Sequence, residues 1–392
     1  MVLRHITLSV SLEPDHFHAD TLDQRDVMPE TTSYEALPNE PTFTQLLNVS
    51  RQVNHVIVHD PQTGVEADYG QFLADMLRTR EDLLRSLPES LLKGKTILDD
   101  ENPYIFLLSE GNYEFIVGAF SILTVGGAFV PLATRILPEE ALHFSSRCGS
   151  AIILASKEFL PLAQEIQQHA FSHGLHITVV EIRVKTSPSV DVFASFLRID
   201  MDVTIPPHRP SMLLFTSGTS GPPKGVVHTR SLFYDIHTTS GPSQVFLSHR
   251  HHLWIGGAMP LIRHPLAGAR LEITKPDPGI LWERLRMGGV TILAGTPRLW
   301  SQMMEYFLDH LKKLPASERD PYLSGARGLR IAHVGGGMPH QSLLRFWRED
   351  LDRPLVVGYG ATELGGRGLK VPPNVNIQVC TPPLATTTAF FV

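Results

Sequence analysis

Short apolar runs alternate with longer amphipathic stretches along most of the chain. The apolar runs, each given together with the turn that ends it, lie at 53–60, 104–110, 151–156, 212–218, 269–273, 290–297, 329–337 and 354–360. Between them, stretches such as 69–84 carry apolar residues at helical spacing. Strands that alternate with helices in this way are typical of a largely parallel sheet with helices on both faces. The pattern therefore predicts an α/β protein with two similar α/β subdomains.

Composition marks the predicted boundaries along the chain. A proline-rich joint at 205–210 separates a first subdomain, 49–204, from a second, 205–370. Residues 1–48 are polar and rich in Pro, Thr and acidic residues, which predicts a loosely packed extension. Residues 371–392 form a divergent tail that contains no charged residue.

One long uncharged segment, 115–133, has the length of a membrane-spanning helix. Gly126, Gly127 and Pro131 interrupt it. A helix that ends at a glycine turn and is followed by a buried strand explains this pattern better. We therefore expect no membrane span.

Length, charge and cysteine content limit the class of protein. With 392 residues, 42% of them hydrophobic, the chain can bury one large core or two smaller ones. A net charge of -6 gives no basic surface and argues against a nucleic-acid partner. Two cysteines, Cys148 and Cys380, are too few for a disulfide framework and favour a reducing compartment. We expect a cytoplasmic protein, and organellar targeting stays open as an alternative.

The segment 213–230, LLFTSGTSGPPKGVVHTR, has the composition of a loop that holds phosphate. Glycines let successive backbone N–H groups turn toward one anion, and hydroxyl groups and a lysine add further donors. The residues concerned are Thr216, Ser217, Gly218, Thr219, Ser220, Gly221 and Lys224. The phosphate loop of nucleotide hydrolases needs Ser or Thr directly after its lysine, whereas Gly225 stands here. A polar surface loop is the alternative.

A second candidate segment, GYGATE at 358–363, follows an apolar run that predicts a buried strand. Parallel α/β folds bind ligands at the carboxyl ends of their strands, so these side chains are expected at a ligand site. Tyr359 offers a ring on which a purine can stack, Thr362 a hydroxyl for a phosphate oxygen, and Glu363 a carboxylate for Mg²⁺. A tight glycine turn with a solvated Glu is the alternative.

Together, the two segments resemble the signature loop and the Tyr-Gly-x-Thr-Glu motif of the adenylate-forming superfamily, which includes acyl-CoA synthetases and luciferases. The loop departs from that signature only at Ser220. The resemblance implies an αβαβα core, and ATP, Mg²⁺ and coenzyme A as ligands. It implies catalytic roles for Lys224, Thr362 and Glu363, and metal binding by Thr219 and Glu363. The nucleotide contacts that it implies are Thr216, Ser217, Gly218, Thr219, Ser220, Gly221, Lys224, Tyr359, Gly360 and Thr362.

Two further segments resemble parts of the same family. VGGGMPH at 334–340 resembles the segment that lies along the adenine edge, which implies that Gly336 and Gly337 contact the nucleotide. The stretch that follows residue 248 resembles the segment that leads into the acid-binding helix. The residues that the second resemblance places near the acid are His252, Trp254 and Gly257. Arg298 is added by GTPRLW at 295–300, which faintly resembles the malonyl-type synthetases. A structural histidine is the alternative for His252.

A second carboxylate on the acid is a further hypothesis. Arg263, His264 and Arg298 could bind one, because the arginine fork binds carboxylates in a bidentate manner. Surface arginines are the alternative.

The reaction that the resemblance implies is ATP-dependent ligation of a carboxylic acid to coenzyme A through an acyl-adenylate. The resemblance ends at about residue 366, so the expected architecture lacks the family's C-terminal α+β domain. Three alternatives stay open. The chain could be an impaired nucleotide- or acyl-binding module, an adenylation unit that needs a separate C-terminal domain or serves a carrier protein, or a luciferase-like oxygenase. The sequence does not identify the acid or the oligomeric state.

Overall fold

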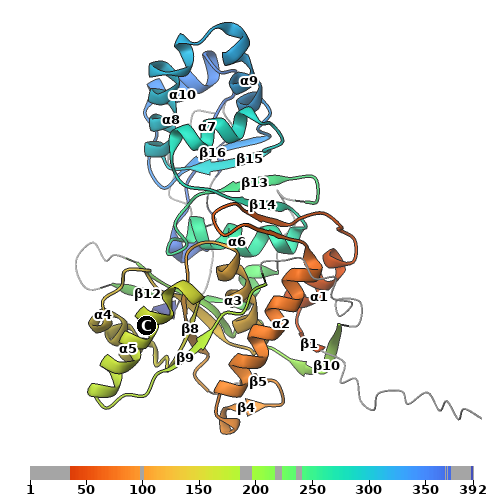
Figure 1. The fold of residues 1–392 in the computed structure, drawn as a ribbon, viewed down its shortest axis with the longest axis vertical. Helices are drawn as coiled ribbons and strands as arrows, with labels where there is room; N and C mark the ends of the chain where they lie inside the picture. Colours follow the sequence, from red (N-terminus) through yellow and green to blue (C-terminus); the bar gives the residue numbers. More distant parts are fainter. Residues whose placement is uncertain are drawn as a thin grey trace, which may run out of the picture. The chain divides into compact units, whose positions relative to one another are not determined.

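The computed structural model describes residues 36–97, 101–185, 197–216, 223–234, 241–366, 368, 370–371 and 390–391. The chain divides into two units, residues 1–34 and residues 35–392, and every described residue belongs to the second. Two large sheets and their covering helices make up this second unit (Figure 1).

The first sheet has seven strands, in the order β19-β12-β11-β7-β6-β8-β9. The neighbours from β11 to β9 are parallel, whereas β12 is antiparallel to both β11 and β19. In the same order, the strands span Phe390–Phe391, Lys224–Thr229, Pro210–Thr216, Ala128–Pro131, Tyr104–Leu108, Ile152–Ala155 and Thr178–Glu181. The helices that pack on this sheet are α2 (Tyr69–Ser86), α3 (Tyr113–Thr124), α4 (Pro138–Cys148) and α5 (Leu160–Ser172).

The second sheet has eight strands, in the order β18-β17-β16-β15-β13-β14-β2-β3. Its six inner strands are parallel, and β18 and β3 are antiparallel edges. The strands span, in this order, Lys370–Val371, Val356–Gly358, Ile331–Gly335, Ile292–Gly295, Val245–Ser248, Arg270–Ile273, Val58–Asp60 and Val65–Ala67. Its helices are α6 (Ile255–Ala267), α7 (Pro278–Arg286), α8 (Pro297–Asp309), α9 (Ala316–Arg327) and α10 (Gln341–Glu349).

Helices cover both faces of each sheet. Side chains alternate across a strand, so Phe106 of β6 packs with α4 and α5, whereas Ile105 packs with α2 and α3. In β13, Leu247 faces the cluster of α7, α8 and α10, whereas Phe246 belongs with α6. One hydrophobic cluster contains α2, α3 and α6 together. The layers therefore follow the order αβαβα, and the predicted fold class is confirmed.

Local sequence signals account for the starts of several helices. Asp68 accepts a hydrogen bond from the backbone N–H of Gln71 and begins α2. Asn112 caps α3 in the same way, and Asp277 caps α7. These side chains satisfy backbone donors that have no partner within the helix.

The remaining described elements are short. They are β1 (Ala36–Asn39), α1 (Pro41–Ser50), β4 (Leu92–Lys93), β5 (Thr96–Ile97), β10 (Arg198–Thr204) and the 3₁₀ turns η1 (Glu89–Leu91), η2 (Lys157–Phe159), η4 (Arg230–Phe233), η5 (Leu311–Lys313) and η6 (Thr362–Leu364).

The chain passes between the two sheets more often than the predicted joint implied. Strands β2 and β3 precede residue 205 but belong to the second sheet, and β11 and β12 follow the joint but belong to the first. Strand β11 is placed there by parallel pairing with β7. The expected division at 205–210 therefore does not separate the sheets, because local composition does not show which strand a segment will pair with.

The prediction that residues 1–48 form a loosely packed extension is wrong for residues 36–48, the part of this segment that the structure describes. Strand β1 pairs with β10, and α1 packs on α6. Leu37, Phe43 and Leu46 are fully buried in the largest hydrophobic cluster. Residues 36–48 therefore belong to the core, and their many polar residues masked this apolar spacing in the sequence.

The uncharged segment 115–133 folds as expected. Helix α3 ends at Thr124, Gly126 turns the chain with a φ of 75°, and β7 follows. Among the described residues, no helix combines the length and the hydrophobicity that crossing a membrane requires.

Candidate functional site

The loops that follow the parallel strands of the eight-stranded sheet meet at one edge. A Cβ atom at Gly336, after β16, would lie 3.6 Å from Nη2 of Arg250, after β13. The same atom would lie 3.8 Å from the methyl carbon of Thr296, after β15. The carboxyl ends of three neighbouring strands thus lie close together, which is where α/β folds bind ligands.

Two glycines at this edge lie against the ring of His333, which is partly buried. Gly335 of β16 pairs with Gly358 of β17, and the imidazole of His333 lies against both. A Cβ atom at Gly358 would lie 2.1 Å from Nε2 of His333, which is too close for any side chain. Directly beyond Gly358, the Tyr359 side chain is 69% exposed. Its ring is therefore accessible, and its stacking on a purine stays a prediction.

The two ends of the predicted phosphate loop are held side by side. Thr216 ends β11 and Lys224 begins β12, the two residues pair in register, and the Thr216 hydroxyl donates to the Lys224 carbonyl at 3.2 Å. The Lys224 side chain is exposed. The other predicted residues of the loop lie outside the described residues: Ser217, Gly218, Thr219, Ser220 and Gly221.

Strand β12 also contacts η6, which carries two other predicted residues, Thr362 and Glu363. Lys224 and His228 lie on one face of β12, whereas Val227 packs into the cluster on the other. His228 is only 6% exposed and lies near the backbone of Thr362. Burial lowers the pKa of His228 to about 4, although the nearby charge of Glu363 opposes this shift. The structure therefore brings the Lys224 strand to Thr362 and Glu363.

His228 was not predicted as a site residue. The alternation from Lys224 along β12 was a signal that could have found it, because residues two apart in a strand share a face.

His252 lies between the two sheets rather than in the open. It is 1% exposed, its Nε2 lies 3.4 Å from the carbonyl oxygen of Leu132, and its ring centroid is 5.1 Å from that of Phe115. Burial lowers its pKa to about 4. These contacts favour the structural histidine over direct contact with an acid. Trp254, at the start of α6, is 61% exposed.

The three residues considered for a second carboxylate lie on two helices. Arg263 and His264 belong to α6, and Arg298 is an exposed residue in the first turn of α8. Helices α6 and α8 cover opposite faces of the sheet. His264 is buried, with Nδ1 2.9 Å from the Pro260 carbonyl oxygen and its ring against Phe246. The hypothesis that His264 binds a second carboxylate is wrong, because its ring already contacts Phe246 in the core and the Pro260 carbonyl oxygen of its own helix.

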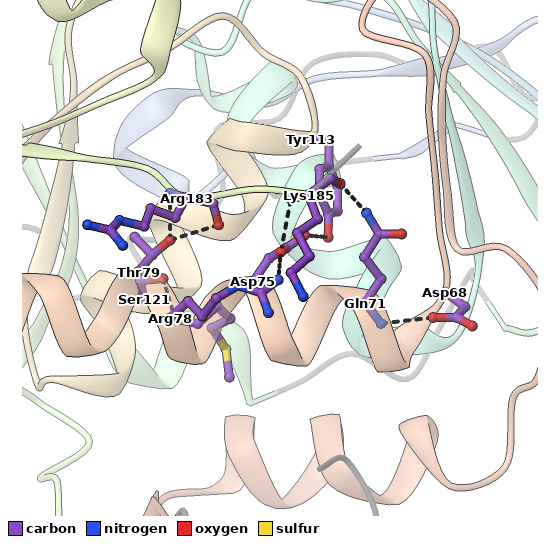
Figure 2. Close-up of polar contacts among 10 residues, drawn as sticks. Asp68, Gln71, Asp75, Arg78, Thr79, Tyr113, Ser121, Arg183 and Lys185 are labelled. Carbon is purple, nitrogen blue, oxygen red and sulfur yellow. Dashed lines mark hydrogen bonds and ion pairs between the residues drawn. The ribbon is translucent and has the colours of Figure 1, made fainter. Parts of the chain in front are cut away.

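A cavity of about 770 Å³ lies elsewhere, beside α2 and the segment 181–185. Figure 2 shows how polar contacts fasten this segment to the helix. Asp75 accepts hydrogen bonds from the Tyr113 hydroxyl at 2.8 Å and from the Lys185 backbone at 3.2 Å, and Thr79 accepts one from the Arg183 backbone at 3.0 Å. None of the predicted site residues lines this cavity, so it is no part of the predicted site.

Comparison with known proteins decides the family. The sequence model of a family described as "AMP-binding enzyme" matches residues 92–390, which is most of the chain. The chain belongs to the AMP-binding enzyme family. This confirms the resemblance on which the site residues were predicted.

Relatives within the family are CoA ligases. The chain is 29% identical to acyl-CoA ligase oryP of Aspergillus oryzae over 338 residues, 84% of this chain and 58% of that protein. It is 22% identical to the mitochondrial malonate–CoA ligase ACSF3 of Xenopus laevis over 80% of this chain and 56% of that protein. The chain thus spans less than two thirds of the length of these relatives.

Solved structures of the family share the fold. The N-terminal domain of FACL13 from Mycobacterium tuberculosis superposes with a TM-score of 0.64 at 19% identity, over 85% of this chain and 79% of that one. Apo MatB from Rhodopseudomonas palustris gives a TM-score of 0.62 at 16% identity, over 82% and 60%. At these identities, the comparison supports the fold alone.

The residues present fit a magnesium ion bound together with a nucleotide. Glu363 is partly exposed on η6, and no described residue donates a hydrogen bond to its carboxylate. Magnesium is commonly held by one or two carboxylates together with substrate phosphates. In the described part of the chain, no three His, Cys, Asp or Glu side chains form a metal-binding group. A site made of Glu363, phosphate oxygens and water agrees with this.

Gly257 is expected to tolerate no side chain. In a Gly257→Ala variant, the new Cβ atom would lie 2.1 Å from the His251 carbonyl oxygen. Because that atom belongs to the backbone, the turn before α6 must shift, and we expect a loss of about 1–3 kcal/mol in the free energy of unfolding. Urea denaturation measures it. Gly241→Ala is the matched control, since its Cβ meets no atom within 4 Å. Equal stability of the two variants would contradict this account.

Proposed function

We propose that the chain carries the acid-activating site of an ATP-dependent acid–CoA ligase. The observation that supports it most is the contact of β12 with η6, which sets the Lys224 face of one strand beside Thr362 and Glu363. The exposed ring of Tyr359 lies three residues before Thr362. These groups offer a stacking surface, a cation, a hydroxyl and a carboxylate within one stretch of the fold, the set that an ATP-Mg²⁺ complex requires.

In the proposed first step, a carboxylate oxygen of the acid attacks the α-phosphorus of ATP, and pyrophosphate leaves with the electron pair of the broken P–O bond. Lys224 and Thr362 stabilise negative charge on the phosphate oxygens, and Tyr359 orients the adenine. Glu363, together with Thr219 as the resemblance implies, would hold a magnesium ion, which when bound would neutralise charge on the phosphates. In the second step, the thiol sulfur of coenzyme A attacks the acyl carbon, loses its proton, and AMP leaves.

Nucleotide binding is the first test. Replacing Lys224 with Ala removes a charged donor, so we expect roughly 10- to 100-fold weaker binding of ATP, measured by calorimetry. In a Glu363→Gln variant, we expect ATP affinity to lose its dependence on Mg²⁺. The control is Lys312→Ala, which removes an exposed lysine on η5. Unchanged ATP affinity in the Lys224 variant would overturn the proposed site.

Release of pyrophosphate with a panel of carboxylic acids and coenzyme A then tests the reaction. The chain is assayed alone and with a C-terminal domain supplied from a family relative. Turnover in either assay supports the ligase, and turnover only with the added domain supports a unit that needs a separate C-terminal domain or serves a carrier protein. ATP binding without turnover in both assays would overturn the ligase and favour a nucleotide-binding module. A reducing, cytoplasmic compartment is part of the same proposal, in keeping with the buried free thiol of Cys148.

A further inference from the structure

Arg250 lies at the edge of the eight-stranded sheet where the carboxyl ends of its parallel strands meet. No motif in the sequence indicated this residue. It lies two residues beyond β13. A Cβ atom at Gly256 would lie 2.5 Å from its Nη1 and 2.6 Å from its Cζ, so the guanidinium lies directly on the Gly256 backbone. Its Nη2 is close to Gly336, a residue expected at the adenine edge. The guanidinium therefore sits between the start of α6 and the glycine turn after β16.

The Arg250 side chain has no protein partner among the residues that the structure describes. No carboxylate there forms an ion pair with it, and no described acceptor takes a hydrogen bond from it. Burial lowers its pKa, and no neighbouring anion opposes that shift. Its charge contributes, after burial, to the lowered pKa of His249. No described anion therefore neutralises the Arg250 charge.

Three other arginines of the same fold, fully or partly buried, have protein acceptors. Arg230 forms an ion pair with Glu40 at 2.9 Å, and Arg284, whose side chain is 23% exposed, donates to Glu272 at 2.8 Å. Arg209 donates to the Gly126 carbonyl at 2.8 Å. A partly desolvated guanidinium without an anion is unfavourable, because neither water nor protein fully compensates its charge. An anion from outside the chain would supply the missing partner.

We propose that Arg250 binds an oxyanion of a ligand at this edge, supplied either by a phosphate of the nucleotide or by a second carboxylate of the acid. The inference rests on the proposed function and extends it to a residue with a defined ligand chemistry. The guanidinium fork forms two parallel hydrogen bonds with either group. Gly256 serves as a positioning residue, since any side chain there would displace the fork.

Direct binding distinguishes the two sources. Calorimetry on the full chain uses ATP, and then, in the presence of ATP, succinate and butyrate, two four-carbon acids that differ in one terminal carboxylate. If Arg250 binds a phosphate, we expect Arg250→Gln to weaken the binding of ATP roughly 10- to 100-fold. If Arg250 binds a carboxylate, we expect the same loss in the binding of succinate and no loss in the binding of butyrate. Gly256→Ala should weaken the same ligand, because its Cβ displaces the guanidinium while the charge stays. The control is Arg348→Gln, which removes an exposed arginine on α10.

A structural role for Arg250 predicts a different result. Because the unliganded guanidinium has no described partner, Arg250→Gln should leave the thermal midpoint of the free chain unchanged or raise it. A lower midpoint with unchanged affinity for all three ligands would overturn the inference. Affinity is measured without turnover, so a wild-type chain that binds ligands but releases no pyrophosphate would count against the proposed ligase and leave this test intact.

Discussion

Replacing Glu40 with Gln should lower the free energy of unfolding by about 3–5 kcal/mol, because it leaves a charged guanidinium buried without an anion. Glu40 and Arg230 form an ion pair at 2.9 Å in which neither side chain is more than 1% exposed. Arg230 also donates two hydrogen bonds to the Leu123 carbonyl, so it cannot move out to water without breaking them. The pair joins α1 to the end of β12. Urea denaturation at pH 7.5 measures the loss.

Two further variants separate burial from the mere presence of an ion pair. Glu81→Gln removes one partner of the exposed pair between Glu81 and Lys95 and should cost no more than about 1 kcal/mol. The double variant Glu40→Met with Arg230→Met removes both buried charges and should be more stable than Glu40→Gln alone. The Leu123 carbonyl keeps a hydrogen bond from the Gly126 backbone in that variant. A single variant as stable as Glu81→Gln would contradict this account of the pair.

Acid should destabilise the fold between pH 6.5 and pH 4, because three buried histidines and the partly buried His249 are held in the neutral form. Burial lowers the pKa values of His228, His249, His252 and His264 from 6.5 to about 4. A histidine of this kind binds its proton more weakly in the folded state than in the unfolded state. The stability linked to it is complete above pH 6.5 and is lost as the pH falls toward 4, by up to about 3 kcal/mol for each ring.

Three carboxyl groups stabilise the folded state as the pH falls, opposite to the effect of the histidines. Burial raises the pKa values of Glu40, Asp75 and Glu114, so these groups hold protons more tightly in the folded state and favour it as the pH falls. One variant isolates the histidine contribution from this background. In His264→Gln, the amide can still donate to the Pro260 carbonyl, and we expect the loss of stability between pH 7.5 and pH 5 to shrink by about 2 kcal/mol. An unchanged pH dependence would show that His264 has no part in it.

Much of the fold could be predicted because each strand carries its own local signal. The apolar runs at 104–110, 269–273 and 329–337 contain β6, β14 and β16. Which strands pair could not be predicted, because backbone hydrogen bonds to a distant segment leave no trace in local hydrophobicity. For the same reason, α1 was missed as a core helix: its burial depends on α6, far along the chain.

Candidate site residues could be named from the sequence where a residue type alone indicates chemistry. Lys224, Tyr359 and Glu363 stood in motifs, and the structure brings the strand of Lys224 to the segment that carries Glu363. Arg250 and His228 have no such motif. His228 is distinguished by burial with no hydrogen-bond partner for its Nε2, and Arg250 by its partly buried place against Gly256. Both properties appear only once the surrounding elements are in place.

The position of β2 has a consequence for synthesis of the chain. This strand pairs with β14 through Val58 and Leu271, and with its hairpin partner β3 on the other side. A ribosome adding 5–20 residues per second needs roughly 10–40 s to pass from one segment to the other. During that time, the hairpin emerges with one edge unpaired, and unpaired strand edges promote aggregation. The edge of β2 that β14 later covers therefore stays open to other chains until β14 has left the ribosome.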